Sequence, residues 1–352
     1  MIESAILLVG GQGTRLRPLT INTPKPMLPV AGFPVTAHQV QKLKDAGIKK
    51  IVLATSYRAE VFSTWIDANS SDCLEIVHAF EEAPLGTGGA IRNGLNKLDL
   101  SLDDAVVVLN GDVLSGHDLN AQIDQFLEIK ADASLHLVNV PDPSAFGLVP
   151  TNSQNLVTAF LEKPKDPSEI VTTQINAGCY ILKVSQINKI ATGRPVSVER
   201  EVFPQMLKSN ARVLGFVDDS YFLDLGNPMA YVQGSADLVR GVAPSSLISN
   251  PADSLIQTNV DVAPSALVCS GSTVMTGALV ADNAVVSGTI VMNDASILDG
   301  VELYDCVVGV GAKINSGVKL RSVVIGDHAE IGKDIELSSG TRVWPDVVLN
   351  IR

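Results

Sequence analysis

GGQGTRLRPLT, residues 10–20, is the stretch that decides the fold of the first part of the chain, because it closes the apolar run Ala5–Val9 with a glycine-rich loop. A strand that ends in such a loop exposes backbone N–H groups, and glycine lets phosphate oxygens come close to them. Two arginines and then Lys25 follow, and these cations can hold the phosphate charge. The stretch therefore predicts a buried strand that leads into a nucleoside triphosphate site.

Two common phosphate-binding motifs do not fit this loop. A Walker loop ends in Gly-Lys-Ser/Thr, and no such triplet closes the stretch. A dinucleotide fingerprint built on Gly11 and Gly13 requires a third glycine where Leu16 stands. A structural turn explains the glycines alone, but it does not explain the cations that follow them.

Apolar runs alternate with helical stretches over the first part of the chain. This alternation predicts an α/β layer with a mixed, mainly parallel sheet. The expected strands are Ala5–Val9, Lys50–Thr55, Leu74–His78, Ala105–Leu109, Ala133–Val140 and Val213–Val217. The expected helices are His38–Ala46, Ala59–Asn69, Gly89–Leu98 and Asn120–Lys130. Since ligands of such folds gather at the carboxyl ends of the strands, the glycine loop and Asn110-Gly111-Asp112 can share one crevice.

Composition limits the classes of function. A chain of 352 residues favours two domains over one, and a formal net charge of −12 argues against general binding of nucleic acid or anionic membranes. No segment has the length of a membrane span, and no secretory signal pattern opens the chain. The four cysteines are far apart and match no metal-ligand spacing, which is typical of a reducing compartment. We expect a cytoplasmic protein.

The last third of the chain carries a repeat. Aliphatic residues recur in steps of six and five, which predicts coils of about seventeen residues with three short faces. The members are Val274, Val280, Val286, Val291, Ile297, Leu303, Val308, Ile314, Leu320, Ile325, Ile331, Leu337, Val343 and Leu349, with Val262 and Val268 as earlier candidates. This is the hexapeptide signature of a parallel β-helix, and its left hand is inferred from the resemblance to hexapeptide proteins. We expect a catalytic domain over 1–240, a linker rich in Ser, Pro and Ala over 241–256, and the repeat domain over 257–352.

The stretch from Gly10 to Pro29 resembles the signature GxGTRLxPLT…PKPMLP of the sugar-phosphate nucleotidyltransferases. The resemblance implies a Rossmann-like catalytic domain and a reaction between a nucleoside triphosphate and a sugar 1-phosphate. It implies that Arg15 and Lys25 are catalytic cations. It also implies nucleotide-binding roles for Leu8 at the end of the strand, for the loop residues Gly10, Gly11, Gly13 and Thr14, and for Arg15, Lys25 and Asp112.

The family resemblance extends to a metal site and a sugar-phosphate site. Asp112 matches the family's Mg²⁺ ligand, and Asp224 in Tyr221-Phe222-Leu223-Asp224-Leu225-Gly226 matches its second metal carboxylate, although Phe222 replaces a tryptophan. The E-K-P and N-x-G segments of the family correspond to Glu162-Lys163-Pro164 and Asn176-Ala177-Gly178. Lys163 is thereby implied to meet the phosphate of the sugar, with Gly147, Glu162 and Asn176 against the sugar. An exposed Glu-Lys pair alone would be an ordinary surface feature.

The segment Glu81–Ala90 resembles the base-reading loop of the family, which implies that Pro84, Gly86 and Thr87 contact the nucleotide. Guanine offers two neighbouring donors, and one carboxylate can accept both, so Glu81 favours guanine and GTP. Glu82 is a rival for this role. The alternative is that the acid sits near the positive end of a helix dipole.

Ser197–Pro204 resembles the S-[IV]-E-[KR]-E-[VI]-F-P stretch of GDP-mannose pyrophosphorylases. Together the resemblances imply that GTP and mannose 1-phosphate give GDP-mannose and pyrophosphate with Mg²⁺, in a homo-oligomer assembled through the β-helix. Three alternatives stay open. They are a glucose 1-phosphate enzyme that uses UTP or dTTP, a bifunctional acetyltransferase with His328 as its histidine, and a regulatory subunit without activity. A lone histidine at a coil corner is more often structural.

Overall fold

The computed structural model describes residues 1–164 and 166–350. By internal contacts the chain divides into two compact units. The first comprises Met1–Gly11 and Gln39–Phe222, and the second comprises Gln12–His38 and Leu223–Arg352. Helix α1 (Val35–Asp45) and strand β13 (Phe222–Asp224) each run across a boundary between the units. Every helix among the described residues is too short or too polar to span a lipid bilayer.

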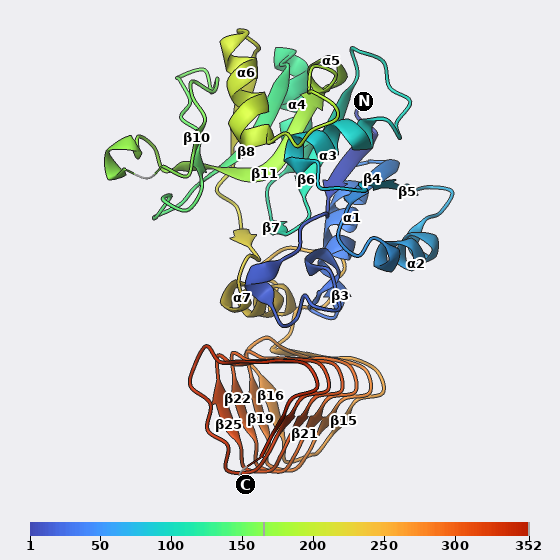
Figure 1. Cartoon of the computed structure of the whole chain (residues 1–352), viewed down its shortest axis with the longest axis vertical. Helices are drawn as coiled ribbons and strands as arrows, with labels where there is room; N and C mark the ends of the chain where they lie inside the picture. Colours follow the sequence, from blue (N-terminus) through green and yellow to red (C-terminus); the bar gives the residue numbers. More distant parts are fainter. Residues whose placement is uncertain (165, 351–352) are drawn as a thin grey trace. The chain divides into compact units, whose positions relative to one another are not determined.

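The first unit is built on a nine-stranded mixed sheet (Figure 1). The central strands β1, β4, β5 and β6 are parallel, and β8 is parallel to β12, whereas β11 runs antiparallel to β6, β8 and β9. The strand bounds are β1 (Ser4–Leu8), β4 (Lys50–Thr55), β5 (Glu75–Phe80), β6 (Ala105–Asn110), β8 (Ala133–Asn139), β9 (Gly147–Leu148), β10 (Leu161–Glu162), β11 (Gln174–Lys183) and β12 (Val213–Val217), with the short β7 (Val113–Ser115) outside this sheet. All six expected strands are confirmed, as is the α/β class.

The remaining helices of the first unit are α2 (Glu60–Asn69), α3 (Gly86–Leu95), α4 (Leu119–Ile129), α5 (Val184–Ile187) and α6 (Phe203–Lys208). Helix α3 can pack closely because it is rich in glycine. A β-carbon added to Gly94 would lie 3.0 Å from Ile6 Cγ2 of the central strand. Helix α3 begins three residues before the expected start at Gly89, so Gly86 and Thr87 belong to its first turn.

Strand β11 is absent from the sequence expectation although it is a long, buried strand. Its polar Asn176 and its Gly178, which has a φ of +76°, interrupt the apolar pattern. The pairing with β8 shifts register between Asn176 and Tyr180, as a bulge does. Because β11 is antiparallel to its neighbours, the sheet is mixed, as the expected fold class requires.

The second unit contains a β-helix of short parallel strands, seen as stacked coils in Figure 1. Strand registers pair Val274 with Val291, Val308, Ile325 and Val343 in succession, so the repeat is confirmed. The pairings of Val262 with Val280 and of Val268 with Val286 confirm the earlier members. The inward side chains are buried in one aliphatic column, as expected for a left-handed parallel β-helix.

Three faces make up this β-helix. The first holds β14 (Ser254–Ile256), β17 (Ser272–Val274), β20 (Ile290–Val291), β23 (Val307–Val308), β26 (Val324–Ile325) and β28 (Arg342–Val343). The second holds β15 (Asp261–Val262), β18 (Leu279–Val280), β21 (Ser296–Ile297), β24 (Lys313–Ile314), β27 (Glu330–Ile331) and β29 (Val348–Leu349). The third holds β16 (Leu267–Cys269), β19 (Val285–Ser287), β22 (Glu302–Tyr304) and β25 (Lys319–Arg321). Strand β14 falls within the last residues of the stretch 241–256.

The second unit also contains the segment 12–38 and helix α7 (Pro228–Val239). The segment forms two single turns, η1 (Thr14–Leu16) and η2 (Lys25–Met27), and a small hairpin of β2 (Pro29–Val30) and β3 (Phe33–Pro34). Ser235 of α7 links these parts, because its hydroxyl accepts the Ala31 N–H at 2.9 Å and lies 3.3 Å from the Thr273 hydroxyl. The cation-rich segment and the repeat domain therefore form one compact unit.

Candidate active site

The glycine loop begins in the first unit at the carboxyl end of β1. Ser56 fixes its start, since the Ser56 hydroxyl donates to the Gly10 carbonyl at 2.6 Å. A β-carbon on Gly10 would lie 2.9 Å from that hydroxyl, whereas one on Gly11 would meet no atom within 4 Å. The backbone of Gly11 is therefore open to a ligand.

Asp112 follows β6, the strand that neighbours β1. Strand β6 pairs with β1 so that Asn110 stands opposite Leu8, and the Gly111 N–H donates to the Leu8 carbonyl at 2.9 Å. A β-carbon on Gly111 would lie 2.6 Å from that carbonyl oxygen, so only glycine fits here. The structure thus brings together the ends of the two strands that the sequence singled out.

The second unit groups three of the expected charged residues. Gly13 has a φ of +59° and lies against Lys25, whose side chain is buried. Lys25 Nζ lies 3.6 Å from Asp224 Oδ1. Arg15 Nη2 lies only 2.7 Å from where a β-carbon on Gly226 would be. The loop after β13 and the cation-rich segment are therefore packed on each other.

Among the expected sugar-phosphate residues, Gly147 and Glu162 stand opposite each other on β9 and β10. Lys163 has a φ of +51°, and its ammonium lies 3.7 Å from the carboxylate of Glu162. Strand β11 pairs with β9 in the sheet. The side-chain amide of Asn176 on β11 donates to the Tyr180 hydroxyl at 2.8 Å, and its carbonyl oxygen accepts the Gly178 N–H. These contacts hold Asn176 beside the pair of short strands.

The expected base-reading loop is fixed by contacts that the sequence did not indicate. Gly86 has a φ of +69°, and its added β-carbon would lie 2.6 Å from the Val196 carbonyl. The Thr87 hydroxyl donates to Glu199 Oε2 at 2.9 Å and accepts the Val198 N–H at 2.9 Å. Thr87 therefore joins the start of α3 to the segment Ser197–Pro204. Glu199 lies in the stretch matched by its motif, but the sequence assigned it no role.

Glu81 turns inward. Its side chain is buried, and its Oε2 accepts the Leu85 N–H at 3.0 Å, directly before helix α3. Burial raises the pKa of the Glu81 carboxyl. This contact is the one expected of an acid at a helix start, and it occupies one of the two oxygens that would read guanine. The rival Glu82 is exposed.

The expected site residues are distributed over both units. The first unit carries Leu8, Gly10, Gly11, Glu81, Pro84, Gly86, Thr87, Asp112, Gly147, Glu162, Lys163 and Asn176. The second unit carries Gly13, Thr14, Arg15, Lys25 and Asp224. No group of three or more metal-ligating side chains occurs within residues 1–164 and 166–350.

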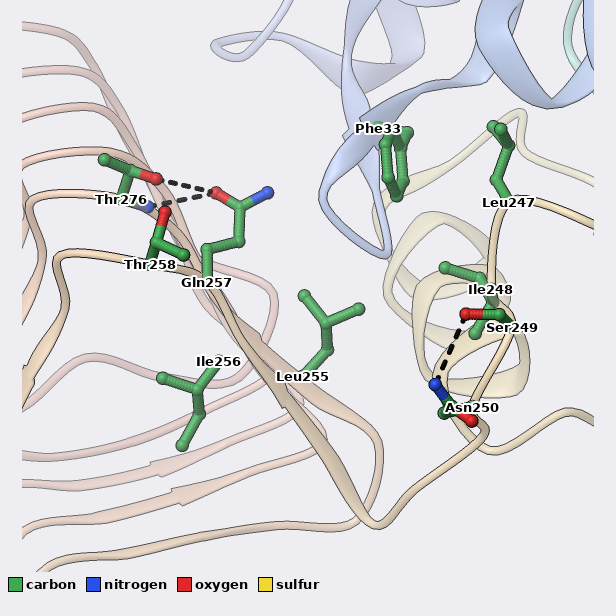
Figure 2. A pocket seen from close by; sticks show the side chains of 10 residues that line it. All are labelled: Phe33, Leu247, Ile248, Ser249, Asn250, Leu255, Ile256, Gln257, Thr258 and Thr276. Atoms are coloured by element: carbon green, nitrogen blue, oxygen red, sulfur yellow. Dashed lines mark hydrogen bonds between the residues drawn. The ribbon is translucent and has the colours of Figure 1, made fainter.

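A cavity of about 510 Å³ in the second unit lies elsewhere (Figure 2). It is lined by Phe33, the stretch Leu247–Asn250, the stretch Leu255–Thr258 and Thr276. None of these side chains is charged, and none belongs to the expected site. The cavity therefore lacks the cationic side chains that would neutralise the charge of a triphosphate or a sugar phosphate.

Comparison with known proteins identifies the family. A family model described as nucleotidyl transferase matches residues 4–241. A mannose-1-phosphate guanylyltransferase of Mycobacterium tuberculosis is 47% identical over 80% of this chain and 79% of its own length. A probable mannose-1-phosphate guanylyltransferase 1 of Oryza sativa is 35% identical over 70% of this chain and 68% of its own. A crystal structure of HddC from Yersinia pseudotuberculosis complexed with GMP-PN matches with a TM-score of 0.56 and 28% identity, covering 66% of this chain and 98% of that one. The chain belongs to the nucleotidyl transferase family.

Proposed function

We propose that this protein is a mannose-1-phosphate guanylyltransferase, which converts GTP and mannose 1-phosphate into GDP-mannose and pyrophosphate. The observation that carries the proposal is the 47% identity to the M. tuberculosis enzyme over most of both chains. The presence of the full set of charged residues that the family motifs require supports a catalytic role over a purely regulatory one. We propose further that the protein is a cytoplasmic homo-oligomer, because its four cysteines are free and its repeat domain presents several sheet faces.

In the proposed reaction, a phosphate oxygen of mannose 1-phosphate attacks the α-phosphorus of GTP. The new oxygen–phosphorus bond forms as the bond from the α-phosphorus to the β-phosphate oxygen breaks, and pyrophosphate leaves with that electron pair. The attacking phosphate is already ionised at neutral pH, so the enzyme needs no general base. Catalysis then rests on positioning and on neutralising charge.

The cations divide this task. We assign Arg15 to the triphosphate and the leaving pyrophosphate, and Lys25 to the oxygens near the α-phosphorus. The left-handed backbone of Gly13 and the buried stem of Lys25 hold this ammonium in place beside Asp224. Lys163 is assigned to the phosphate of the sugar, while Glu162, Asn176 and Gly147 orient the sugar hydroxyls.

The proposed cofactor is Mg²⁺, held by Asp112 and Asp224 together with phosphate oxygens of the nucleotide. These two carboxylates fit the ion, because Mg²⁺ takes oxygen ligands and is usually bound through one or two carboxylates plus substrate phosphates. When bound, the ion offsets the repulsion between two anionic reactants.

A substrate panel tests the proposal. Purified protein is incubated with GTP, ATP, UTP, CTP or dTTP and with mannose 1-phosphate or glucose 1-phosphate, and pyrophosphate release is measured. We expect the highest kcat/KM for GTP with mannose 1-phosphate. Faster turnover of UTP or dTTP with glucose 1-phosphate would replace the proposal with that activity, and no turnover of any pair would favour a regulatory subunit.

The repeat domain offers no support for acetyl transfer. His328 has a φ of +58°, and its ring packs over Gly311 of the preceding coil, where an added β-carbon would lie 2.6 Å from Nδ1. The His328 N–H donates to the Val310 carbonyl at 2.8 Å. This histidine forms a corner of the coil, so we propose no second activity.

A further inference from the structure

One arginine of the last β-helix coil contacts the signature loop. Arg342 lies on β28, and its Nη1 donates to the Arg15 carbonyl at 2.8 Å and to the Arg17 carbonyl at 2.9 Å. A terminal guanidinium nitrogen carries two N–H groups, so it can donate one hydrogen bond to each carbonyl. All three residues belong to the second unit.

The outward-facing positions of the first β-helix face show that this arginine is unusual in its row. Strand registers align Arg342 with Thr273, Ile290, Val307 and Val324 on the preceding coils. These four positions are uncharged and buried, as expected for a covered apolar face. Arg342, on the last coil, is the charged residue of this row, and its side chain is the one that reaches the loop carbonyls. A hydrophobic residue would continue the row, but it could not donate to the loop.

The contact fixes the turn that presents Arg15. Gly13 starts the single turn η1 in a left-handed conformation, and the Arg17 N–H closes it on the Thr14 carbonyl. Arg342 holds the carbonyls on either side of Leu16, whose side chain is buried. At the other end of the Arg15 side chain, the guanidinium lies against Gly226. The backbone of Arg15 is thus held by the β-helix, and its head group packs against the loop after β13.

We propose that Arg342 is a positioning residue for Arg15, so that the last coil of the β-helix preorganises the triphosphate-binding loop. This inference rests on the proposed role of Arg15 in nucleotide binding. Without the two hydrogen bonds, the loop samples more conformations. Nucleotide binding must then restrict the loop to one conformation, and this entropic cost weakens productive binding. The repeat domain then contributes to turnover and is more than a platform for assembly.

Steady-state kinetics of three variants test this role. Arg342→Met keeps the apolar stem but removes the donors, and Arg342→Lys keeps the charge and donors on a flexible stem. Arg321→Ala is the matched control. Arg321 is also an exposed β-helix arginine, but it lies on the third face, where it pairs with Asp305. We expect Arg342→Met to lower kcat/KM for GTP about tenfold or more while KM for mannose 1-phosphate stays unchanged. Arg342→Lys should recover part of the loss, and Arg321→Ala should match the wild type.

A second measurement is independent of the substrate. Amide hydrogen exchange should be faster in Arg342→Met than in wild type over residues 13–20, with the β-helix coils before Arg342 unchanged. Unchanged kinetics and unchanged exchange in that window would overturn the inference. If the wild type turned over no GTP, the proposed function would fail, yet the exchange data would still decide whether Arg342 holds the loop. A general loss of protection across the second unit would show a structural role only and would also overturn the positioning role.

Discussion

Gly147 lies so close to Glu162 that a β-carbon on Gly147 would stand 2.6 Å from Glu162 Oε2. The two residues are opposite each other in a short antiparallel pair, so Gly147→Ala must displace the carboxylate. The displaced atom is the flexible end of a side chain, and we expect the fold to tolerate the change. KM for mannose 1-phosphate should rise several-fold in initial-rate assays, while KM for GTP stays the same. An unchanged KM for the sugar phosphate would remove Glu162 from the sugar site.

Thr87 joins helix α3 to Glu199 and to the Val198 N–H. Thr87→Val keeps the shape of the side chain but leaves the Val198 N–H without its acceptor, and the Glu199 carboxylate keeps only the Ser197 hydroxyl as donor. The free energy of unfolding should therefore fall by about 1–3 kcal/mol. Urea denaturation followed by far-UV circular dichroism measures the loss. Thr87→Ser is the control, because it retains the hydroxyl and should fall close to the wild type. Equal stability of Thr87→Val and wild type would show that the link contributes little.

The stacked imidazoles of His117 and His136 should make the first unit sensitive to acid. Their ring centroids are 3.9 Å apart, and burial lowers the pKa of His136 to about 4 and the pKa of His117 well below its ordinary value. Lys42 Nζ lies 3.0 Å from His117 Nδ1 and further disfavours protonation. The backbone carbonyl and the charge of Asp218, together with the charge of Asp219, oppose this lowering of the His136 pKa. Both rings are therefore neutral in the folded protein at neutral pH.

The sign of the pH dependence follows from these shifts. The histidines of the unfolded chain take up protons below about pH 6.5, whereas the folded His136 takes one up only near pH 4. Stability therefore falls as pH falls through the window from about 6.5 to 4. Urea midpoints measured across this window should decrease steadily for wild type and less steeply for His136→Gln. Parallel curves for the two proteins would contradict this account.

Mg²⁺ dependence tests the two proposed metal carboxylates. Chelation with EDTA should abolish turnover, and added Mg²⁺ should restore it. Asp112→Asn should lower kcat by about a hundredfold or more and raise the Mg²⁺ concentration needed for half-maximal rate. Asp219→Asn is a suitable control, because Asp219 is an exposed carboxylate that accepts hydrogen bonds from Asn139. Full activity of Asp112→Asn at low Mg²⁺ would remove this residue from the metal site.

The sequence predicted which residues of successive coils of the repeat domain pair with one another. Each coil needs one inward aliphatic side chain per face, so the spacing of these side chains along the sequence gives the strand register. The third face is the exception. Leu337 continues the aliphatic series, but the strands of that face end at Lys319–Arg321. Strand β11 escaped prediction because a bulge and Gly178 hide its periodicity. Arg342 escaped prediction because its partners are backbone carbonyls, which leave no pattern in side-chain spacing.

Glu81 offers a test between two roles that the sequence could not separate. Its buried carboxylate accepts the Leu85 N–H, so it holds the entry to α3, and its second oxygen is the part that would read guanine. Glu81→Gln keeps an oxygen for Leu85 but presents an amide, which suits uracil or thymine better than guanine. If Glu81 reads the base, kcat/KM for GTP relative to UTP should fall about tenfold or more in Glu81→Gln, with little change in thermal stability. If it only holds the helix start, Glu81→Gln should keep the nucleotide preference, and Glu81→Ala should lower the melting temperature and the rates with all nucleotides alike. Glu82→Gln is the control for the exposed neighbour, and a preference that shifts in that variant instead would move base reading to Glu82.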